Sequence, residues 1–318
     1  MRAARFREWG STPVIDDVPE PVRADGEVLV EVRAAAVAHL DVTVSGGDFG
    51  MKPPLPYIGG VEGAGVVLEA DRDAGLAPGT QVMLRGAGLG MLRDGTWTQR
   101  VSVPLKAVTV LESALAPEVA ATFFVPATTG YVAVRDVARV GKDDHVIVVG
   151  AAGAVGAMVV QHALAAGATV TGIVGRPEHV SQVPAGAEAL DLTSDSDVAA
   201  LAGARPASVL IDTLGGEGLI GRTRWVRPGG RAVVIGYVAG PRVEIDLPSW
   251  LLDDVALLPV NMIRQERRAR EIAPELVRML AADEIQVAVE RFSLGEVAQA
   301  LEALRSGSLK GRAVVIPG

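Results

Sequence analysis

The alternation of apolar and polar positions changes twice along the chain. Up to about residue 120, short apolar runs such as EVLVEVRAAAV, GAGVVLEA and TQVMLRG are separated by Gly and Pro, which is typical of strands joined by turns. From about residue 123 to 265, four apolar segments recur, HVIVV, ATVTGIV, SVLIDTL and RAVVIGYV. Helix-like stretches separate them, and this alternation predicts a parallel sheet with helical crossovers.

The last part of the chain no longer alternates strands with helices in this way. Two helical patterns, REIAPELVRMLAADEI and LGEVAQALEALRSG, are followed by a strand-like segment, GRAVVIPG. These elements are too few to bury a third core, so we expect them to fold back onto the first domain. The predicted domains are residues 1–122 with 266–318, and residues 123–265 as an insertion between them.

A glycine-rich turn stands between the first apolar strand and the first apolar helix of the inserted segment. Residues 145–156 read HVIVVGAAGAVG, followed directly by MVVQHALAAGA. This order suits a dinucleotide pyrophosphate, because the turn exposes backbone N–H groups and the helix N-terminus adds a favourable dipole. We expect Gly156 to let helix and strand pack closely; a turn with a purely structural role is the alternative. The expected backbone contacts are Ala152, Gly153, Ala154 and Val155.

The end of the next strand indicates which dinucleotide is bound. NAD-preferring sites carry an acidic residue about 20 positions beyond the glycines, and counting from Gly156 reaches Gly175 and Arg176. A guanidinium there can pair with a 2′-phosphate, with His179 assisting, which favours NADPH over NADH. The alternative is a solvated loop cation, and Glu178 beside it complicates the local charge.

The amino-acid composition indicates a globular protein and argues against several classes of partner. The 318 residues are 49% hydrophobic and 21% charged, as in a globular protein with two domains. A net charge of −8 argues against nucleic acid or an anionic membrane as partner, and no apolar run approaches the roughly 20 residues of a membrane span. The N-terminus lacks the apolar core of a signal peptide, and cysteine is absent. We therefore expect a cytoplasmic enzyme.

The order of motifs along the whole chain resembles one known superfamily. The segments that carry the resemblance are VAHLDVTVSGGDFG at 37–50, PYIGGVEGAGVV at 56–67, GTWTQRVSVP at 95–104, PATTGY at 126–131, GAAGAVG at 150–156, IDTLGG at 211–216 and LKGRAVV at 309–315. They are similar to the medium-chain dehydrogenases/reductases, within them the zinc-independent quinone oxidoreductase and enoyl reductase branch. The resemblance implies an α/β fold: a GroES-like β-rich catalytic domain plus a Rossmann doubly wound parallel-sheet domain inserted near the C-terminus.

Departures from that superfamily concern the metal. Its zinc-dependent members place ligands at the positions of Ala38 and Val61, with a third near Pro126 and Ala127. None of these side chains can bind Zn²⁺, and a structural zinc site would need cysteines that this chain lacks. A tetrahedral site needs three or four converging ligands, so we expect no metal. The nearby donors that remain are His39, Asp41 and Glu62.

The resemblance then implies hydride transfer from NADPH to a small-molecule acceptor, a quinone or an α,β-unsaturated carbonyl. His39 is a candidate to bind the ribose or donate to an enolate oxygen; a packed or solvated loop histidine is the equal alternative. Asp41 is a further catalytic candidate, but a role as a helix cap or salt-bridge partner is favoured over catalysis. Tyr57, in a proline-rich loop, is a candidate acid that we expect to face the site. Where quinone-type relatives carry a pocket tyrosine, this chain has Phe49.

The remaining expectations concern cofactor contacts and assembly. The resemblance and the strand ends assign contacts to Thr129, Leu214, Gly236, Tyr237 and Lys310, although Thr129 could be a helix cap and Lys310 an exposed turn lysine. We expect a homodimer formed through the apolar stretch at 243–262. A tailoring reductase of the same fold and a non-catalytic NADPH-binding sensor remain open alternatives, because a fold does not fix an activity.

Overall fold

The computed structural model describes residues 1–47, 49–50, 52–192 and 195–318. Backbone contacts divide the chain into two units. Unit 1 comprises Met1–Phe124, Val277–Ala282 and Val287–Gly318, and unit 2 comprises Val125–Leu276 and Asp283–Gln286. The chain thus returns to unit 1 later than the predicted residue 266, and the functional domain boundaries stay a prediction.

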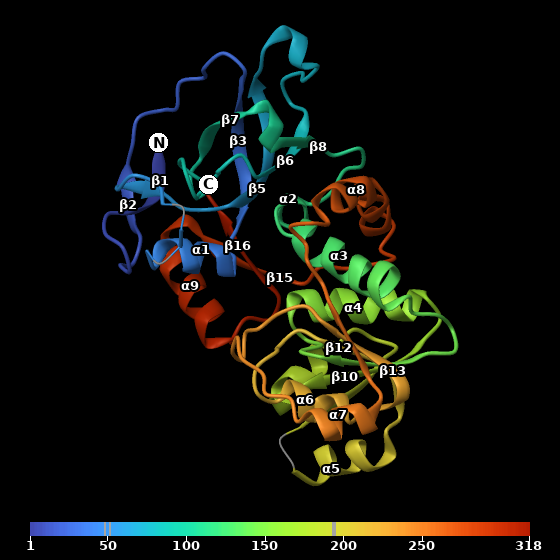
Figure 1. Cartoon of the computed structure of the whole chain (residues 1–318). Helices are drawn as coiled ribbons and strands as arrows, with labels where there is room; N and C mark the ends of the chain where they lie inside the picture. Colours follow the sequence, from blue (N-terminus) through green and yellow to red (C-terminus); the bar gives the residue numbers. More distant parts are fainter. Residues whose placement is uncertain (48, 51, 193–194) are drawn as a thin grey trace. The chain divides into compact units, whose positions relative to one another are not determined.

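Unit 1 is built mainly from antiparallel strands, with short helices beside them (Figure 1). Its strands are β1 Arg2–Phe6, β2 Val14–Asp17, β3 Glu27–Ala36, β4 Tyr57–Ile58, β5 Glu62–Glu69, β6 Gln81–Arg85, β7 Arg100–Pro104, β8 Val108–Val110, β15 Val289–Ser293 and β16 Arg312–Ile316. Its helices are α1 His39–Ser45, α2 Pro117–Ala120 and α9 Val297–Ser306. One sheet has the order β2-β1-β4, and a second has the order β15-β16-β3-β5-β6-β8 with β7 also paired to β3.

The core of unit 1 forms around aromatic side chains that its first strands bring together. Trp97 is fully buried and its indole Nε1 donates to the carbonyl oxygen of Ala36 at 2.9 Å. Phe6 lies against Trp97, with ring centroids 5.9 Å apart. Gly59 packs so tightly under the indole that a β-carbon there would overlap it. This contact ties β4 and the turn after it to the core, and that turn continues into the candidate site.

Unit 2 contains a sheet whose neighbouring strands are all parallel. Its strands are β9 His145–Val149, β10 Thr169–Val174, β11 Glu188–Asp191, β12 Ala207–Asp212, β13 Val226–Val234 and β14 Ala256–Pro259. Their order in the sheet is β11-β10-β9-β12-β13-β14. The chain therefore winds outward from β9 in one direction and then from β12 in the other, which is the doubly wound topology. The predicted parallel sheet with helical crossovers is confirmed.

Helices cover both faces of this parallel sheet. The helices in this part of the chain are α3 Phe124–Tyr131, α4 Ala154–Ala165, α5 Asp195–Ala204, α6 Leu219–Thr223, α7 Leu247–Asp253 and α8 Glu266–Ala281, of which the last turns belong to unit 1. In Figure 1, α3 and α4 lie on one face and α5, α6 and α7 on the other. Within the described residues, none of the helices is both long and apolar enough to cross a membrane.

The side chains of β9 explain why the sheet needs helices on both faces. Val146 and Val148 pack with Val159 and Val160 of α4, whereas Ile147 and Val149 pack with Trp225 on the opposite face. A strand buried on both faces is apolar throughout rather than alternating. The run HVIVV therefore has the composition that a central strand requires.

Candidate active site

The glycine-rich turn links β9 to α4 in a tight conformation. Gly150, directly after β9, has a left-handed φ of 78°, which glycine adopts without steric cost. The N–H of Gly153 donates to the carbonyl oxygen of Gly150 at 2.9 Å, and Gly153 is the N-cap of α4. A β-carbon at Gly156 would overlap the carbonyl oxygen of Gly150. The expected close packing of helix against strand at Gly156 is confirmed.

The turn presents backbone N–H groups at the carboxyl end of β9. The N–H groups of Gly150 and Ala151 donate to the carbonyl oxygen of Ile173, at 3.0 and 3.1 Å, and so fasten the turn to β10. The first-turn N–H groups of α4, including those of Ala154 and Val155, have no acceptor within the helix. Together with the helix dipole they form an environment suited to a phosphate group. Ala152 and Gly153 complete this segment.

The chain leaves β10 at the same edge of the sheet. Gly175 and Arg176 are exposed directly beyond the strand. The N–H of His179 donates to the carbonyl oxygen of Arg176 at 3.0 Å, within a short helical turn. Gly175, Arg176 and His179 therefore lie beyond the strand that pairs with β9, at the edge that carries the glycine turn.

The loops after β12 and β13 meet each other at this edge too. The N–H of Ala239 donates to the carbonyl oxygen of Leu214 at 2.8 Å. A β-carbon at Gly215 would lie 2.6 Å from the carbonyl oxygen of Gly236. Tyr237 is 74% exposed. The structure thus brings Leu214, Gly236 and Tyr237 together at the carboxyl edge.

Two further predicted cofactor contacts, Thr129 and Lys310, do not lie on the loops that follow these strands. Thr129 is buried on α3, next to Gly130, which packs closely against Met158 of α4. Lys310 belongs to unit 1 and is exposed in the turn before β16, where its backbone N–H donates to a carboxylate oxygen of Glu290 at 2.9 Å. Thr129 therefore shares unit 2 with the glycine turn, whereas Lys310 does not.

In unit 1, Asp41 joins the start of α1 to the turn after β4. One carboxylate oxygen accepts the N–H of Ala38 at 2.8 Å, and the other accepts the N–H groups of Gly60 and Val61 at 3.1 Å each. Asp41 is 3% exposed. Its pKa is raised to about 7, mainly by this burial and also by the nearby charge of Glu62, while the three backbone N–H groups oppose the shift. These contacts match the capping alternative for Asp41.

The two other catalytic candidates have contrasting surroundings. Tyr57 is only 2% exposed and stacks on Phe6 with ring centroids 5.3 Å apart. β4 pairs with β1 and turns the Tyr57 ring into the aromatic core, away from solvent. The role of Tyr57 as an acid stays a prediction. His39 opens α1 and its ring reaches solvent. Loss of hydration and then the charge of Arg312 lower the pKa of His39, so the ring is neutral at pH 7.

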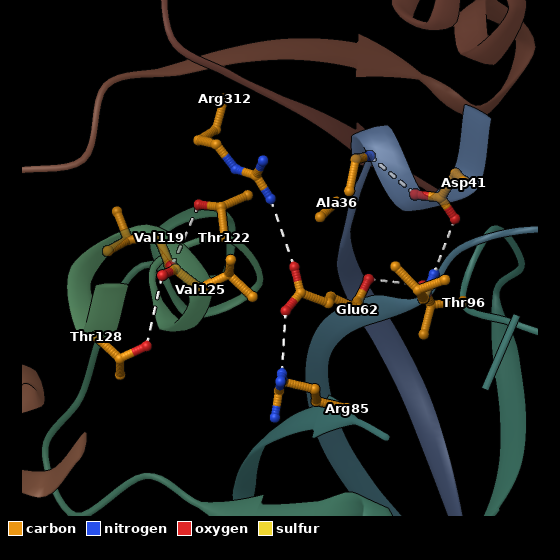
Figure 2. A network of polar contacts seen from close by, with 12 residues as sticks. Ala36, Asp41, Glu62, Arg85, Thr96, Val119, Thr122, Val125, Thr128 and Arg312 are labelled. Atoms are coloured by element: carbon orange, nitrogen blue, oxygen red, sulfur yellow. Dashed lines mark hydrogen bonds and ion pairs between the residues drawn. The ribbon is translucent and has the colours of Figure 1, made fainter. Parts of the chain in front are cut away.

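A buried carboxylate between two guanidinium groups adjoins Asp41. Glu62 lies 3.4 Å from Arg85 through one oxygen and 3.4 Å from Arg312 through the other (Figure 2). Burial raises the pKa of Glu62, and the charges of Arg312 and Arg85 oppose that shift. Glu62 and Arg312 stand in two separate sequence motifs, GVEGAGVV and LKGRAVV, that do not indicate their pairing. The only signal was their place on strands that flank β3 in the sheet.

The side chains present do not fit a zinc ion. Ala38 and Val61 occupy two of the ligand positions of zinc-dependent dehydrogenases and have no donor atom. Both oxygens of Asp41 accept backbone N–H groups, and both oxygens of Glu62 face guanidinium groups. Among the described residues, no group of three or more His, Cys, Asp or Glu side chains is arranged to hold a metal.

Comparison with known proteins places this architecture in a family. A family model described as "Alcohol dehydrogenase GroES-like domain" matches residues 24–113, and one described as "Zinc-binding dehydrogenase" matches residues 185–315. The predicted GroES-like and Rossmann architecture is therefore confirmed.

Individual relatives cover nearly the whole chain. An alcohol dehydrogenase from Geobacillus stearothermophilus is 25% identical, covering 99% of this chain and 98% of its own length. A quinone oxidoreductase from Lama guanicoe is 26% identical over 99% and 97%. A cobalt- and zinc-bound alcohol dehydrogenase from Pyrobaculum aerophilum superposes with a TM-score of 0.82 at 28% identity, covering 100% and 99%. The chain is an oxidoreductase that belongs to the medium-chain dehydrogenase/reductase superfamily.

Proposed function

We propose that this protein is a metal-free, NADPH-dependent oxidoreductase that reduces a quinone or an α,β-unsaturated carbonyl compound. The observation that carries the proposal is the edge of the parallel sheet between β9 and β12. The strand order reverses between β9 and β12, and the glycine turn and the Arg176 turn follow the carboxyl ends of the neighbouring strands β9 and β10. Open parallel sheets bind nucleotides at this kind of edge.

Different residues of unit 2 would contact different parts of the cofactor. The backbone of Ala152 to Val155 would hold the pyrophosphate at the N-terminus of α4. Arg176, assisted by His179, would pair with the 2′-phosphate that distinguishes NADPH from NADH. Leu214, Gly236 and Tyr237 would contact the cofactor from the neighbouring loops, and Thr129 and Lys310 remain further proposed contacts.

The proposed acceptor follows from the chemistry of unit 1. NADPH supplies a hydride, and a conjugated acceptor then needs a hydrogen-bond donor at its oxygen rather than a metal ion. His39 is exposed and neutral at pH 7, so it can donate one hydrogen bond to a developing enolate oxygen. Asp41 supports the start of α1 and thereby holds His39, its neighbour on the helix.

The proposal extends to assembly and location. We propose a cytoplasmic homodimer formed through residues 243–262, where α7 exposes Leu247, Leu251 and Leu252 by 59%, 69% and 84%. The edge strand β14 lies in the same stretch. An exposed apolar surface beside a free sheet edge favours association with a second copy.

The first experiment is a titration of the purified protein with NADPH and with NADH, followed by oxidation of NADPH with a simple quinone and a 2-enone. We expect preferential binding of NADPH and turnover of at least one acceptor. In Arg176→Ala, the affinity for NADPH should fall about tenfold or more and the affinity for NADH should change little, since one charge-assisted contact to phosphate is lost.

The control is Arg227→Ala, which removes an exposed arginine from the other end of the sheet, on β13. It should leave both affinities unchanged. Tight binding without turnover of any acceptor would instead favour a sensor or a specialised tailoring reductase. Failure to bind either nucleotide would overturn the proposal.

A further inference from the structure

A buried ion pair holds the loop that follows β12. Asp212, the last residue of that strand, is fully buried, and its Oδ2 accepts a hydrogen bond from Nε of Arg222 on α6 at 2.6 Å. Its Oδ1 accepts the N–H groups of Leu214 and Gly215 at 2.8 Å each. Arg222 also donates from Nη2 to the carbonyl oxygen of Gly215 at 2.7 Å. The pair therefore binds both donor and acceptor groups of the loop backbone.

The loop that the ion pair holds also packs through its backbone against the loop after β13. Gly215 and Gly216 both have left-handed φ angles, 64° and 71°, and carry no side chain that could pack. A fully hydrogen-bonded ion pair can fix such a backbone, because the planar guanidinium donates from two atoms in a fixed geometry. The charges of Asp212 and Arg222 satisfy each other, so the burial of each charge is compensated.

The loop is also the junction between its neighbours on the carboxyl edge. On one side, Oγ1 of Thr213 donates to the carbonyl oxygen of Val149 at 2.8 Å, next to the glycine turn. On the other side, the carbonyl oxygen of Leu214 accepts the N–H of Ala239. A shift of residues 214–216 would therefore move the loop that carries Gly236 and Tyr237.

We infer that Arg222 is a positioning residue for the dinucleotide: through Asp212 and Gly215 it holds two loops in the conformation that receives the cofactor. This inference rests on the proposed function. The sequence gives no spacing signal for it, because Arg222 lies on a short helix beyond the glycine motif and meets Asp212 only through the fold.

The test compares Arg222→Ala and Arg222→Lys with the unmodified protein. The dissociation constant for NADPH is measured by titration, and hydrogen exchange is measured for the backbone of residues 212–218. We expect Arg222→Ala to weaken NADPH binding about tenfold and to speed exchange of this segment. Arg222→Lys should fall in between, because a single ammonium group keeps the charge but cannot reproduce the two-point contact.

A matched control separates positioning from general stability. Arg231 forms a comparable ion pair with Asp144 at 2.9 Å, at the opposite edge of the same sheet, just before β9. Arg231→Ala should lower the melting temperature yet leave the affinity for NADPH unchanged. In steady state, Arg222→Ala should raise the KM for NADPH more than it lowers kcat, whereas a purely structural loss would reduce the active fraction and lower kcat alone.

The outcomes distinguish this inference from the function on which it rests. If the unmodified protein binds neither NADPH nor NADH, the proposed function fails and this inference fails with it. If it binds NADPH and Arg222→Ala binds equally well, only the inference is overturned. An equal loss of affinity in Arg231→Ala would overturn it too. If Arg222→Ala does not fold, Arg222→Lys and Arg222→Gln carry the same comparison.

Discussion

Asp41 is a residue whose pKa is strongly raised by its surroundings. Its pKa of about 7 in the folded protein lies above the ordinary value of 3.8. Between these two pH values, the folded state therefore holds a proton that the unfolded state releases. The stabilising contribution of this proton is complete below pH 4 and is lost as the pH rises through 7. The free energy of unfolding should therefore fall across this window, by up to about 1.4 kcal/mol per pH unit from this group.

Asp41→Asn tests this prediction, because the amide keeps the size of the side chain and does not titrate. Urea unfolding midpoints measured between pH 4 and 8 should fall less steeply with pH in the variant than in the unmodified protein. Asp73→Asn, at an exposed carboxylate of the same unit, controls for the change in net charge. Parallel slopes for Asp41→Asn and the unmodified protein would mean that Asp41 stays ionised.

At the residue scale, sequence reasoning identified the residues near the site more reliably than their roles. The capping alternative for Asp41 follows from its place in the first turn of a helix, a local relation. The burial of Tyr57 was not foreseen, because it depends on Phe6 and on the pairing of two strands far apart in sequence. The ion pairs of Glu62 and Asp212 were missed as well, because their arginine partners meet these carboxylates only through the fold.

At the element scale, the packing of α4 against β9 depends on Gly156. Because a β-carbon there would overlap the carbonyl oxygen of Gly150, Gly156→Ala must push the helix away from the strand. We expect a loss of stability of about 1–3 kcal/mol, the usual cost of overpacking, together with weaker NADPH binding. Thermal unfolding and the NADPH titration measure the two effects.

The matched control for this prediction is Gly203→Ala in α5. No heavy atom lies within 4 Å of the position that its β-carbon would take, and alanine favours a helix more than glycine does. This variant should be neutral or slightly more stable, with unchanged affinity for NADPH. If Gly156→Ala behaved like Gly203→Ala, the close contact of helix and strand would not constrain the turn.

The central strands could be predicted from sequence, whereas the edge strands could not. Residues 145–149, 169–174 and 207–212 lie between helices on both faces, so their apolar runs stand out. In contrast, β11 reads EALD and, among the described residues, pairs with β10 alone. An edge strand needs fewer apolar side chains and may carry charges, so its composition does not distinguish it from a loop.

At the scale of the whole molecule, the alternation of strands and helices in one segment made the two-part architecture predictable. The segment in which the chain returns to unit 1 was less predictable. Contacts divide α8 at Leu276, although the helix is continuous from Glu266 to Ala281 and Pro274 does not end it. Membership of a unit depends on what each turn of a helix packs against, which a periodic pattern does not reveal.

The proposed homodimer predicts that apolar side chains on the surface of unit 2 are buried against a second copy. Leu251 and Leu252 of α7 are 69% and 84% exposed, and a charged side chain in an apolar interface would be buried without a partner. Leu251→Asp combined with Leu252→Asp should therefore shift the molar mass measured by light scattering from dimer to monomer. Val22→Asp, at an 89% exposed position of unit 1, should leave it unchanged. A dimer that survives both leucine substitutions would exclude α7 from the interface, and the edge of β14 would become the surface to test.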